Sequence, residues 1–521
     1  MKNHLIHVFS CLCLIGISIG ASAQHSALNK VYYDMDYGIH TYGGAASPDG
    51  GFIITGIIYN SQGHVIKIDP SGIIEWVKAF DNITFEDVIC EQDSSVVAAG
   101  SYYQPGNSSL CLVKLSNQGD TIWTRNISVP HNPGHFHLQK SSDGGYLISA
   151  STENYGNPSL SEALLVKTSS EGNLIWAKTF NTDTHLDFAY SVAELPDGNL
   201  MMCGESRSYN PFKSKLLMMV TDENGNLITS KVMEDSTITR SIAIDIVIVE
   251  DGVVLYSLLN DEVSAIKVDF DLNPVWSKRY LQYHYNMYTN KYGNLIKSID
   301  GGFLLASPSF GFSSFIKINS MGEMVWTQMV FMDLVEAMHA GEGGFMLLGN
   351  GPVYGVKTVP DYIPQIGAYR TDSTGTGGSC IYNNMNHHEN YTPVFSDIIM
   401  QGASVGVQQN KTFTVSDFTL LNSDTCVAFT GNAESQSITK GKIRIYPNPA
   451  KDIFSIELPE NSPNTFQHLE IYRTDGALVY HTTNTDCLTK GVSPGQLNNG
   501  LYLVRLHTSA GTFTGKLIIS K

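Results

Sequence analysis

The chain has 521 residues, with 49 acidic and 32 basic side chains and a formal net charge of −17. This length exceeds one ordinary domain, and the acidity argues against nucleic acid or anionic membranes as partners. Charged residues make up 16% of the chain, whereas 47 Gly, 26 Tyr and 22 Phe favour short strands joined by tight turns, and 42% hydrophobic residues exclude disorder throughout.

The first 23 residues have the pattern of a secretory signal peptide. Lys2 precedes a mostly apolar run from Leu5 to Gly20, and Ala21-Ser22-Ala23 follows it. We expect cleavage between Ala23 and Gln24. The apolar run is too short for a transmembrane anchor, which needs about 20 apolar residues, and no other stretch approaches that length. We therefore expect export to the periplasm and no transmembrane segment in the mature chain.

A repeat with a period near 50 residues follows the leader. A Lys, a Gly five positions later and a Trp four positions after the Gly recur along the chain, and the glycine position falls at 72, 119, 172, 225, 272, 322 and 375. Position 272 is Leu, and the unit around 225 has Val220 and Thr229 in place of Lys and Trp. All five tryptophans belong to this motif: Trp76, Trp123, Trp176, Trp276 and Trp326. Such a period indicates an array of similar structural units.

Each unit carries a second turn signal about midway. An acidic residue and Gly precede an apolar run at Asp49, Asp143, Asp197, Asp251, Asp300 and Glu342, with a degenerate copy at Asp93. Asp-Gly before such a run is typical of a tight hairpin, because glycine tolerates the positive φ that the turn requires. About four strands per unit predict an all-β fold, with a seven-bladed β-propeller over residues 24–375. If the Lys-to-Trp hairpin lies within one blade, Leu28–Tyr32 must pair with the segment near Ala368 and Tyr369 to close the ring; if the hairpin connects blades, no such closure is needed.

The repeated Trp and Lys have structural interpretations. Because the Trp recurs in nearly every unit, whereas a ligand site is asymmetric, we expect packing between blades rather than ligand contact. We expect the repeated Lys to face solvent, with its stem covering apolar surface.

Residues 376–440 break the repeat. The stretch is rich in Asn, Thr and Ser, and its alternating runs at 404–407 and 412–415 predict a β-hairpin. Cys380 and Cys426 bracket it, and we expect them to form a disulfide in an exported protein. A polar linker over 432–440 then follows.

Residues 441–521 form a separate module of alternating strands and Asp-Gly and Asn-Gly turns, which predicts a small β-sandwich. The module resembles the type A C-terminal sorting domain of the type IX secretion system of Bacteroidetes. The residues that carry the resemblance are Pro447, Asn448, Pro449, Asp475, Gly476, Gly500, Tyr502 and Lys521. It implies recognition by the type IX machinery, export across the outer membrane, and release or attachment at the cell surface.

Catalytic and cofactor motifs are scarce. His131, His135 and His137 have usable metal-ligand spacing, but no nearby carboxylate or Cys joins them, so we interpret them as loop histidines. We assign no catalytic residue, cofactor or metal. The expected function is a secreted or cell-surface propeller that binds a glycan or a protein. Two alternatives stay open: a propeller enzyme, either a glycan hydrolase or lyase or a quinoprotein-like dehydrogenase, with a pocket of convergent carboxylates, Tyr or His at the ring's axis; and a structural surface protein that self-associates.

Overall fold

The computed structural model describes residues 28–33, 38–58, 62–129, 132–153, 161–182, 185–209, 211–283, 293–308, 313–330, 332–340, 343–351, 365–376, 381–383, 388–409, 411, 413–417, 420–424, 439–451, 453–457, 466–473, 478–483, 491–493, 497–508 and 511–520. The chain divides into two compact units, Met1–Ala428 and Phe429–Lys521. No helix among the described residues is long and apolar enough to cross a membrane. The predicted cleavage site at Ala23 and Gln24 and the predicted Cys380–Cys426 disulfide lie outside the described residues.

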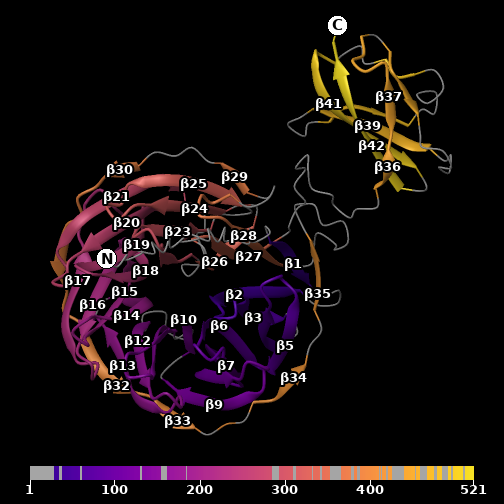
Figure 1. The fold of residues 1–521 in the computed structure, drawn as a ribbon. Helices are drawn as coiled ribbons and strands as arrows, with labels where there is room; N and C mark the ends of the chain where they lie inside the picture. The colour runs from indigo at the N-terminus through magenta and orange to yellow at the C-terminus, as the bar shows by residue number, and fades with distance from the viewer. Residues whose placement is uncertain are drawn as a thin grey trace, which may run out of the picture. The chain divides into compact units, whose positions relative to one another are not determined.

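The first unit is a ring of seven sheets, the blades of a propeller (Figure 1). The blades follow one another along the chain, beginning with blades 1, 2 and 3. Blade 1 contains β2 (Ile39–Ala46), β3 (Phe52–Ile58), β4 (Gln62–Ile68) and β5 (Ile74–Asp81). Blade 2 contains β6 (Ile83–Cys90), β7 (Val96–Gln104), β8 (Asn107–Leu115) and β9 (Thr121–Ser128). Blade 3 contains β10 (Asn132–Lys140), β11 (Tyr146–Glu153), β12 (Glu162–Thr168) and β13 (Leu174–Asn181).

The remaining blades repeat this order. Blade 4 contains β14 (Leu186–Glu194), β15 (Leu200–Tyr209), β16 (Phe212–Thr221) and β17 (Leu227–Met233). Blade 5 contains β18 (Ser241–Val249), β19 (Gly252–Leu259), β20 (Glu262–Val268) and β21 (Pro274–Tyr283). Blade 6 contains β22 (Leu295–Lys297), β23 (Phe303–Ser307), β24 (Ser313–Ile318) and β25 (Met324–Val330). Blade 7 contains β26 (Asp333–His339), β27 (Phe345–Asn350) and β28 (Ile366–Thr371).

The two ends of the repeat region meet in blade 7. Strand β1 (Asn29–Tyr33) pairs with β28 in antiparallel register, with Asn29 opposite Tyr369 and Tyr32 opposite Ile366. The Lys-to-Trp hairpin lies within one blade, since Lys67 on β4 pairs with Trp76 on β5. Of the two closure modes considered for the sequence, the ring therefore uses the one that joins its ends.

A fifth strand covers the outer edge of every blade, and all seven such strands come from residues 381–424. We call this segment the belt. It contains β29 (Ile381–Asn383), β30 (His388–Asn390), β31 (Phe395–Asp397), β32 (Gln401–Val405), β33 (Val407–Gln409), β34 (Val415–Asp417) and β35 (Leu421–Asp424). These strands pair in turn with β25, β21, β17, β13, β9, β5 and β1. The belt thus visits blades 6, 5, 4, 3, 2, 1 and 7, against the chain order of the blades (Figure 1).

The belt corrects the prediction of a hairpin within 376–440. The two runs expected to pair with each other lie on different blades: Ser404 pairs with Lys178, and Val415 pairs with Phe80. The physical reason is that the outermost strand of each blade presents unpaired backbone groups, and a short belt strand satisfies them. Phe413 is buried in the core between blades 1 and 2, so the belt also contributes apolar packing.

The expectation that the repeated Lys faces solvent is also wrong. The Lys67 side chain is 2% exposed and that of Lys317 is 3% exposed, and each is paired with the Asp of its own blade's Asp-Gly turn. The Asp-Gly turn joins the first two strands of the blade, and its Asp carboxylate lies next to the Lys ammonium and neutralises it.

The second unit is β-rich. A five-stranded sheet has the order β36 (Thr439–Lys442), β42 (Gly511–Ile519), β41 (Gly500–Thr508), β39 (Phe466–Arg473) and β40 (Leu478–Thr482). Strands β37 (Arg444–Tyr446) and β38 (Ser455–Glu457) form a second, two-stranded sheet. Side chains from both sheets share one apolar core, which includes Ile445, Ile456 and Ile471. This is the arrangement of a small sandwich.

Candidate ligand site at the propeller axis

The innermost strands of the blades surround a cavity of about 310 Å³ at the ring's axis. Residues from β2, β6, β10, β14, β18 and β26, and the segment at the start of β22, contribute to its lining. The polar and aromatic residues in that lining are Tyr42, Glu86, Asp87, Phe136, His137, Gln139, Lys140, Tyr190, Asp245, Asn294 and Glu336. A small cavity with several convergent polar groups is typical of a site for a small ligand.

The innermost strands of six blades carry a β-bulge at the same repeat position. The side chains at this position are not all alike, and this makes the cavity wall asymmetric. The pairing of the innermost strand with its neighbour shifts at one point in six blades, at Tyr42, Glu86, His135 and Phe136, Tyr190, Ile244 and Val335. A bulge leaves the extra residue out of the ladder and re-aims its side chain. From this shared backbone feature, two of the six blades present a tyrosine and the other four present different residue types, and all of these residues except His135 line the cavity.

The residue after the bulge ties one blade to the next. Asp87 Oδ2 accepts a hydrogen bond of 2.7 Å from Leu138 N of blade 3, and Asp245 Oδ2 accepts one of 2.8 Å from Leu295 N of blade 6. Asn294 Oδ1 likewise accepts a bond of 3.0 Å from Ala337 N of blade 7. These bonds satisfy backbone groups at the blade interfaces and hold the cavity wall in one arrangement.

His137 of blade 3 also accepts a backbone hydrogen bond from the next blade. Val192 N of blade 4 donates to His137 Nδ1 over 3.3 Å, and Ser191 Oγ donates to Asp245 Oδ1 over 2.8 Å. The sequence suggested that His135 and His137 were loop histidines. Both lie on β10, where His137 lines the cavity and the His135 ring stands edge-on to Tyr190 with 5.7 Å between ring centroids.

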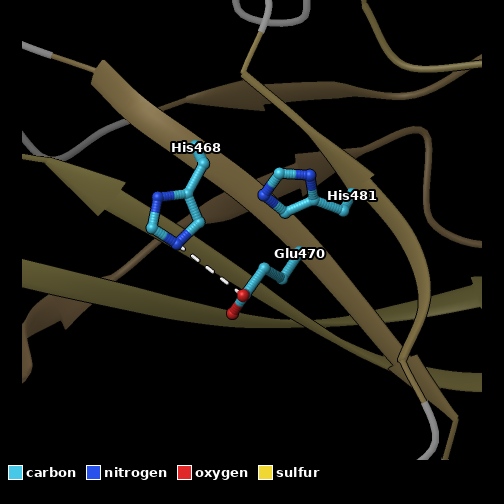
Figure 2. A group of neighbouring side chains, drawn as sticks. All are labelled: His468, Glu470 and His481. Carbon is cyan, nitrogen blue, oxygen red and sulfur yellow. Dashed lines mark ion pairs between the residues drawn. The ribbon is translucent and has the colours of Figure 1, made fainter.

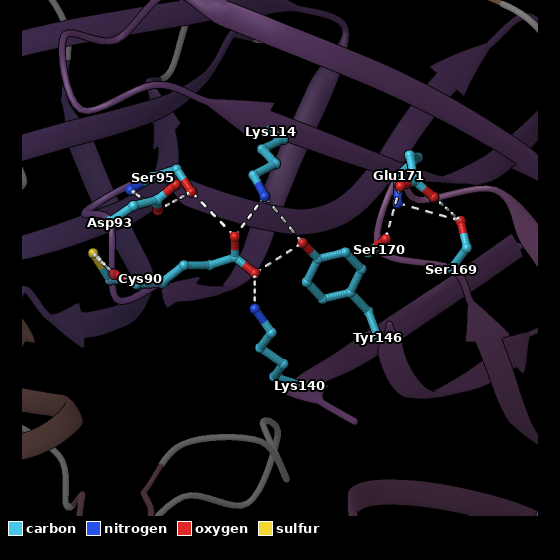
Figure 3. Close-up of polar contacts among 10 residues, drawn as sticks. Cys90, Asp93, Ser95, Lys114, Lys140, Tyr146, Ser169, Ser170 and Glu171 are labelled. Carbon is cyan, nitrogen blue, oxygen red and sulfur yellow. Dashed lines mark hydrogen bonds and ion pairs between the residues drawn. The ribbon is translucent and has the colours of Figure 1, made fainter. Parts of the chain in front are cut away.

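Lys114, Lys140 and Tyr146 converge on one buried carboxylate (Figure 3). The Glu91 side chain, 8% exposed, accepts hydrogen bonds from Lys114, Lys140 and Tyr146, the last over 3.0 Å. Burial raises the pKa of Glu91, but the bonds from Lys114 and Lys140 outweigh it and lower that pKa to about 2. Burial and the neighbouring Glu91 carboxylate raise the pKa of Tyr146, which keeps its hydroxyl a donor. The network joins blades 2 and 3 and holds Lys140 at the cavity.

The repeated tryptophans lie away from the axis, on the fourth strand of their blades. Each indole packs against the turn glycine of the next blade: Trp76 on Gly119, Trp123 on Gly172, Trp176 on Gly225, Trp276 on Gly322 and Trp326 on Gly375. Blade 4 has Thr229 at the Trp position, and blade 5 has Leu272 at the matching glycine position, with a φ of 61°. Two blade pairs thus lack the Trp: the pair of blades 4 and 5 also lacks the Gly, whereas the pair of blades 7 and 1 keeps Gly72, against which Leu28 packs.

Several residues of the predicted sorting motif tie the start of the second unit to its last strand. Asn448 Nδ2 donates to Lys516 O over 2.7 Å, and Asn448 Oδ1 accepts from Ile518 N over 2.8 Å. The flanking Pro447 and Pro449 both follow cis peptide bonds. Tyr502, two residues after Gly500 at the start of β41, is buried and donates to Asn498 O over 2.9 Å. Asp475, Gly476 and Lys521 lie outside the described residues.

The residues of the axial site were not predicted from the sequence, although they stand at a fixed distance from the acidic residue of each second turn. The cavity residues Tyr42, Glu86, Phe136, Tyr190, Ile244, Gly293 and Val335 each stand seven positions before the acidic residue of their unit's second motif. The next position along holds Asp87, His137, Asp245, Asn294 and Glu336. Reading back from each turn therefore identifies the cavity wall.

Comparison with known proteins agrees with the division into two units. Residues 444–520 match the family model described as a secretion system C-terminal sorting domain. A comparison with curated proteins finds no match to the chain.

Solved structures similar to the chain cover about two thirds of it. A streptogramin B lyase is 10% identical, with a TM-score of 0.41, and the alignment covers 66% of this chain and 97% of the lyase. The Dos1 propeller is 10% identical at a TM-score of 0.39, covering 68% and 96% of the two chains. A protein of unknown function from Dyadobacter fermentans is 10% identical at 0.39, covering 69% and 99%. At these TM-scores the likenesses say nothing about ligand or chemistry. The family match agrees with the resemblance seen in the motif around Asn448, and the chain is a type IX secretion substrate with a sorting domain at 444–520 behind a β-propeller.

Proposed function

We propose that this exported propeller is a binding module for a glycan, and that one sugar of the glycan occupies the axial cavity. The observation that carries the proposal is the set of bulges, which place Tyr42, Glu86 and Tyr190 at the cavity from equivalent positions of different blades. Carboxylates, amides and Lys140 suit the hydroxyl groups of a sugar, and a tyrosine ring suits its apolar face. About 310 Å³ is at the lower end of small-molecule sites, which suits one sugar unit rather than a long chain.

Binding is favoured over catalysis because the axial carboxylates already serve the fold. Asp87 and Asp245 accept backbone hydrogen bonds from the next blade, and such bonds hold each carboxylate in one position. A general acid or base must instead exchange a proton with substrate during each cycle.

One observation favours an enzyme as the second candidate. The axial cavity has the composition expected for that alternative, since Glu86, Asp245 and Glu336 converge on it from three blades together with Tyr42 and His137. A glycan hydrolase or lyase would use two of these carboxylates as acid and base.

A glycan array probed with the full mature chain tests the proposal. Hits are then measured by calorimetry with Glu86→Gln and Tyr42→Ala, which alter two cavity residues, and with Glu223→Gln, a matched change at an exposed turn of blade 4. We expect both cavity variants to weaken binding at least ~10-fold and the control to bind normally, as for lost hydrogen bonds and stacking of about 1.5 kcal/mol or more.

The same samples distinguish the alternatives. One outcome is that the parent chain releases new sugar products from the array hits, and that this release is lost in Glu86→Gln or in Asp245→Asn. That result would contradict the binding proposal and support an enzyme. Absence of any glycan hit together with concentration-dependent self-association in sedimentation would favour the structural surface role.

We further propose that the route of export runs through the periplasm and ends with release or attachment outside the cell. The sorting-domain match supports it. Deletion of 444–521 should leave the protein in the periplasmic fraction, whereas normal appearance outside the cell without these residues contradicts the proposal.

A further inference from the structure

Two histidines and one glutamate come together on the face of the sorting-domain sheet that points away from its core (Figure 2). His468 and Glu470 alternate along β39 with the fully buried Leu469 and Ile471, so they share the opposite face. His481, on the neighbouring strand β40, stands directly opposite Glu470 in the antiparallel register. Within the part of the chain that the structure describes, this is the one group of three such side chains with metal-ligand proximity.

The three ligand atoms are close enough to hold one ion. Each residue offers one atom, and all of these atoms lie within 4.8 Å of one another. His468 Nε2 lies 3.6 Å from Glu470 Oε1, and the two imidazole centroids are 5.5 Å apart. Tetrahedral Zn²⁺ with bonds of about 2.0–2.1 Å has its ligand atoms about 3.3 Å apart. Small side-chain rotations therefore bring these three groups to coordination distance.

A second set of contacts orients the carboxylate. Tyr472 Oη donates to Glu470 Oε2 over 2.8 Å, which leaves Oε1 on the side of His468. The Arg505 guanidinium of β41 lies over the Tyr472 ring, 5.2 Å from its centroid. Metal-binding carboxylates are commonly held by such an outer partner, which fixes the direction of the ligating oxygen.

We propose that His468, Glu470 and His481 form a binding site for a divalent transition metal, with Zn²⁺ as the probe. Two imidazoles and one carboxylate are a ligand set that Zn²⁺ prefers, and His481 is exposed, so an ion can enter and a water can hold the fourth position. The site joins β39 to β40, and β40 is the edge strand of the five-stranded sheet. A bound ion thus pins the edge strand of the sorting domain to its neighbour.

Calorimetry with Zn²⁺ tests the site on the full chain, purified without a histidine tag and stripped with chelator. We expect one ion per chain and at least ~10-fold weaker binding in His468→Ala, Glu470→Gln and His481→Ala. Tyr472→Phe keeps every ligand and removes only the bond to Glu470, so it should weaken binding by a smaller factor. His339→Ala, an exposed histidine of blade 7, is the matched control and should bind like the parent.

Co²⁺ titration gives an independent readout, because bound cobalt shows visible absorption bands that depend on its ligands. The bands should appear in the parent and in His339→Ala and should be lost in His481→Ala, while circular dichroism confirms that each variant is folded. Equal Zn²⁺ affinity and equal cobalt spectra for the parent and His481→Ala would overturn the proposal, as would the absence of a one-to-one Zn²⁺ isotherm in the parent.

Discussion

Lys67 Nζ lies 2.7 Å from Asp49 Oδ2, which joins the two repeated motifs of the first blade by an ion pair. Asp49 belongs to the turn before β3, and Lys67 belongs to β4. The same pair recurs as Lys167–Asp143 at 2.9 Å, Lys267–Asp251 at 2.6 Å and Lys317–Asp300 at 2.8 Å. Blade 4 has Val220 in place of the Lys, and its Asp197 instead accepts a bond from Asn199 Nδ2. The Lys and the Asp-Gly turn are therefore one structural unit.

Asp49→Ala should lower the free energy of unfolding more than Asp197→Ala. Both changes remove a side-chain bond to a turn N–H, but only the first takes a carboxylate from a buried lysine. Burial lowers the pKa of Lys67, and its bonds to Asp49 and Glu75 outweigh this and raise it, so the lysine stays charged. We expect Asp49→Ala to cost about 1–3 kcal/mol more than the control.

Urea unfolding followed by tryptophan fluorescence measures this difference, because all five tryptophans lie in the blades and report on the propeller alone. Equal costs for the two variants would show that the Lys67–Asp49 pair adds no stability.

Acid should remove the stabilisation that Glu91 provides. Its pKa is about 2 in the folded protein against 4.5 ordinarily. Because the folded pKa is depressed, the stabilisation is present above about pH 4.5 and is lost as the pH falls toward 2. At pH 6 the free energy of unfolding of the parent should exceed that of Glu91→Gln by on the order of 3 kcal/mol, since a shift of one pKa unit corresponds to about 1.4 kcal/mol. Unfolding curves at several pH values check this, and a gap that does not narrow on acidification contradicts it.

Gly172→Ala should destabilise the propeller more than Gly198→Ala. Both glycines have positive φ, 72° and 88°, so each substitution carries the backbone cost of about 1–2 kcal/mol. A Cβ at Gly172 would stand 2.6 Å from the Trp123 ring, whereas a Cβ at Gly198 meets nothing within 4 Å. We expect an additional ~1–3 kcal/mol at Gly172 from the clash. Combining Gly172→Ala with Trp123→Ala should remove that excess, and an unchanged excess would mean that the two residues do not interact.

Non-reducing peptide mapping should find Cys380 linked to Cys426. The two residues flank the ends of the belt, and its end strands β29 and β35 lie on blades 6 and 7, which are neighbours in the ring. A bond between them would close the belt around the propeller. Cys90, Cys111 and Cys203 are not disulfide-bonded and serve as internal controls for alkylation. Alkylation of Cys380 and Cys426 without reductant would contradict this prediction.

The sequence is informative about the ring because each blade repeats its turns. The Gly-to-Trp spacing and the Asp-Gly turns mark local hairpins, whose geometry depends on a few adjacent residues. The belt gives no such signal, because its strands are 3–5 residues long and pair with strands that lie up to about 390 positions away, as Tyr33 does with Leu421. The Lys prediction failed for a related reason: strand alternation gives the face of Lys67 but not the turn that covers it.

The residues of the axial cavity can be predicted from the sequence only in part. Alternation alone places Glu86 and Asp87 on opposite faces of β6, and the bulge between Phe85 and Asp87 changes that assignment. A single strand carries no sign of such a bulge. The common distance of seven positions to the acidic turn residue becomes informative only when all units are aligned.

A crystal structure of the full chain with the tightest array-selected glycan tests the proposed function most directly. We predict a sugar in the axial cavity, with hydrogen bonds to Glu86 or Lys140 and its apolar face near Tyr42 or Tyr190. A glycan bound on the belt or the outer strands, with no sugar at the axis, would contradict it.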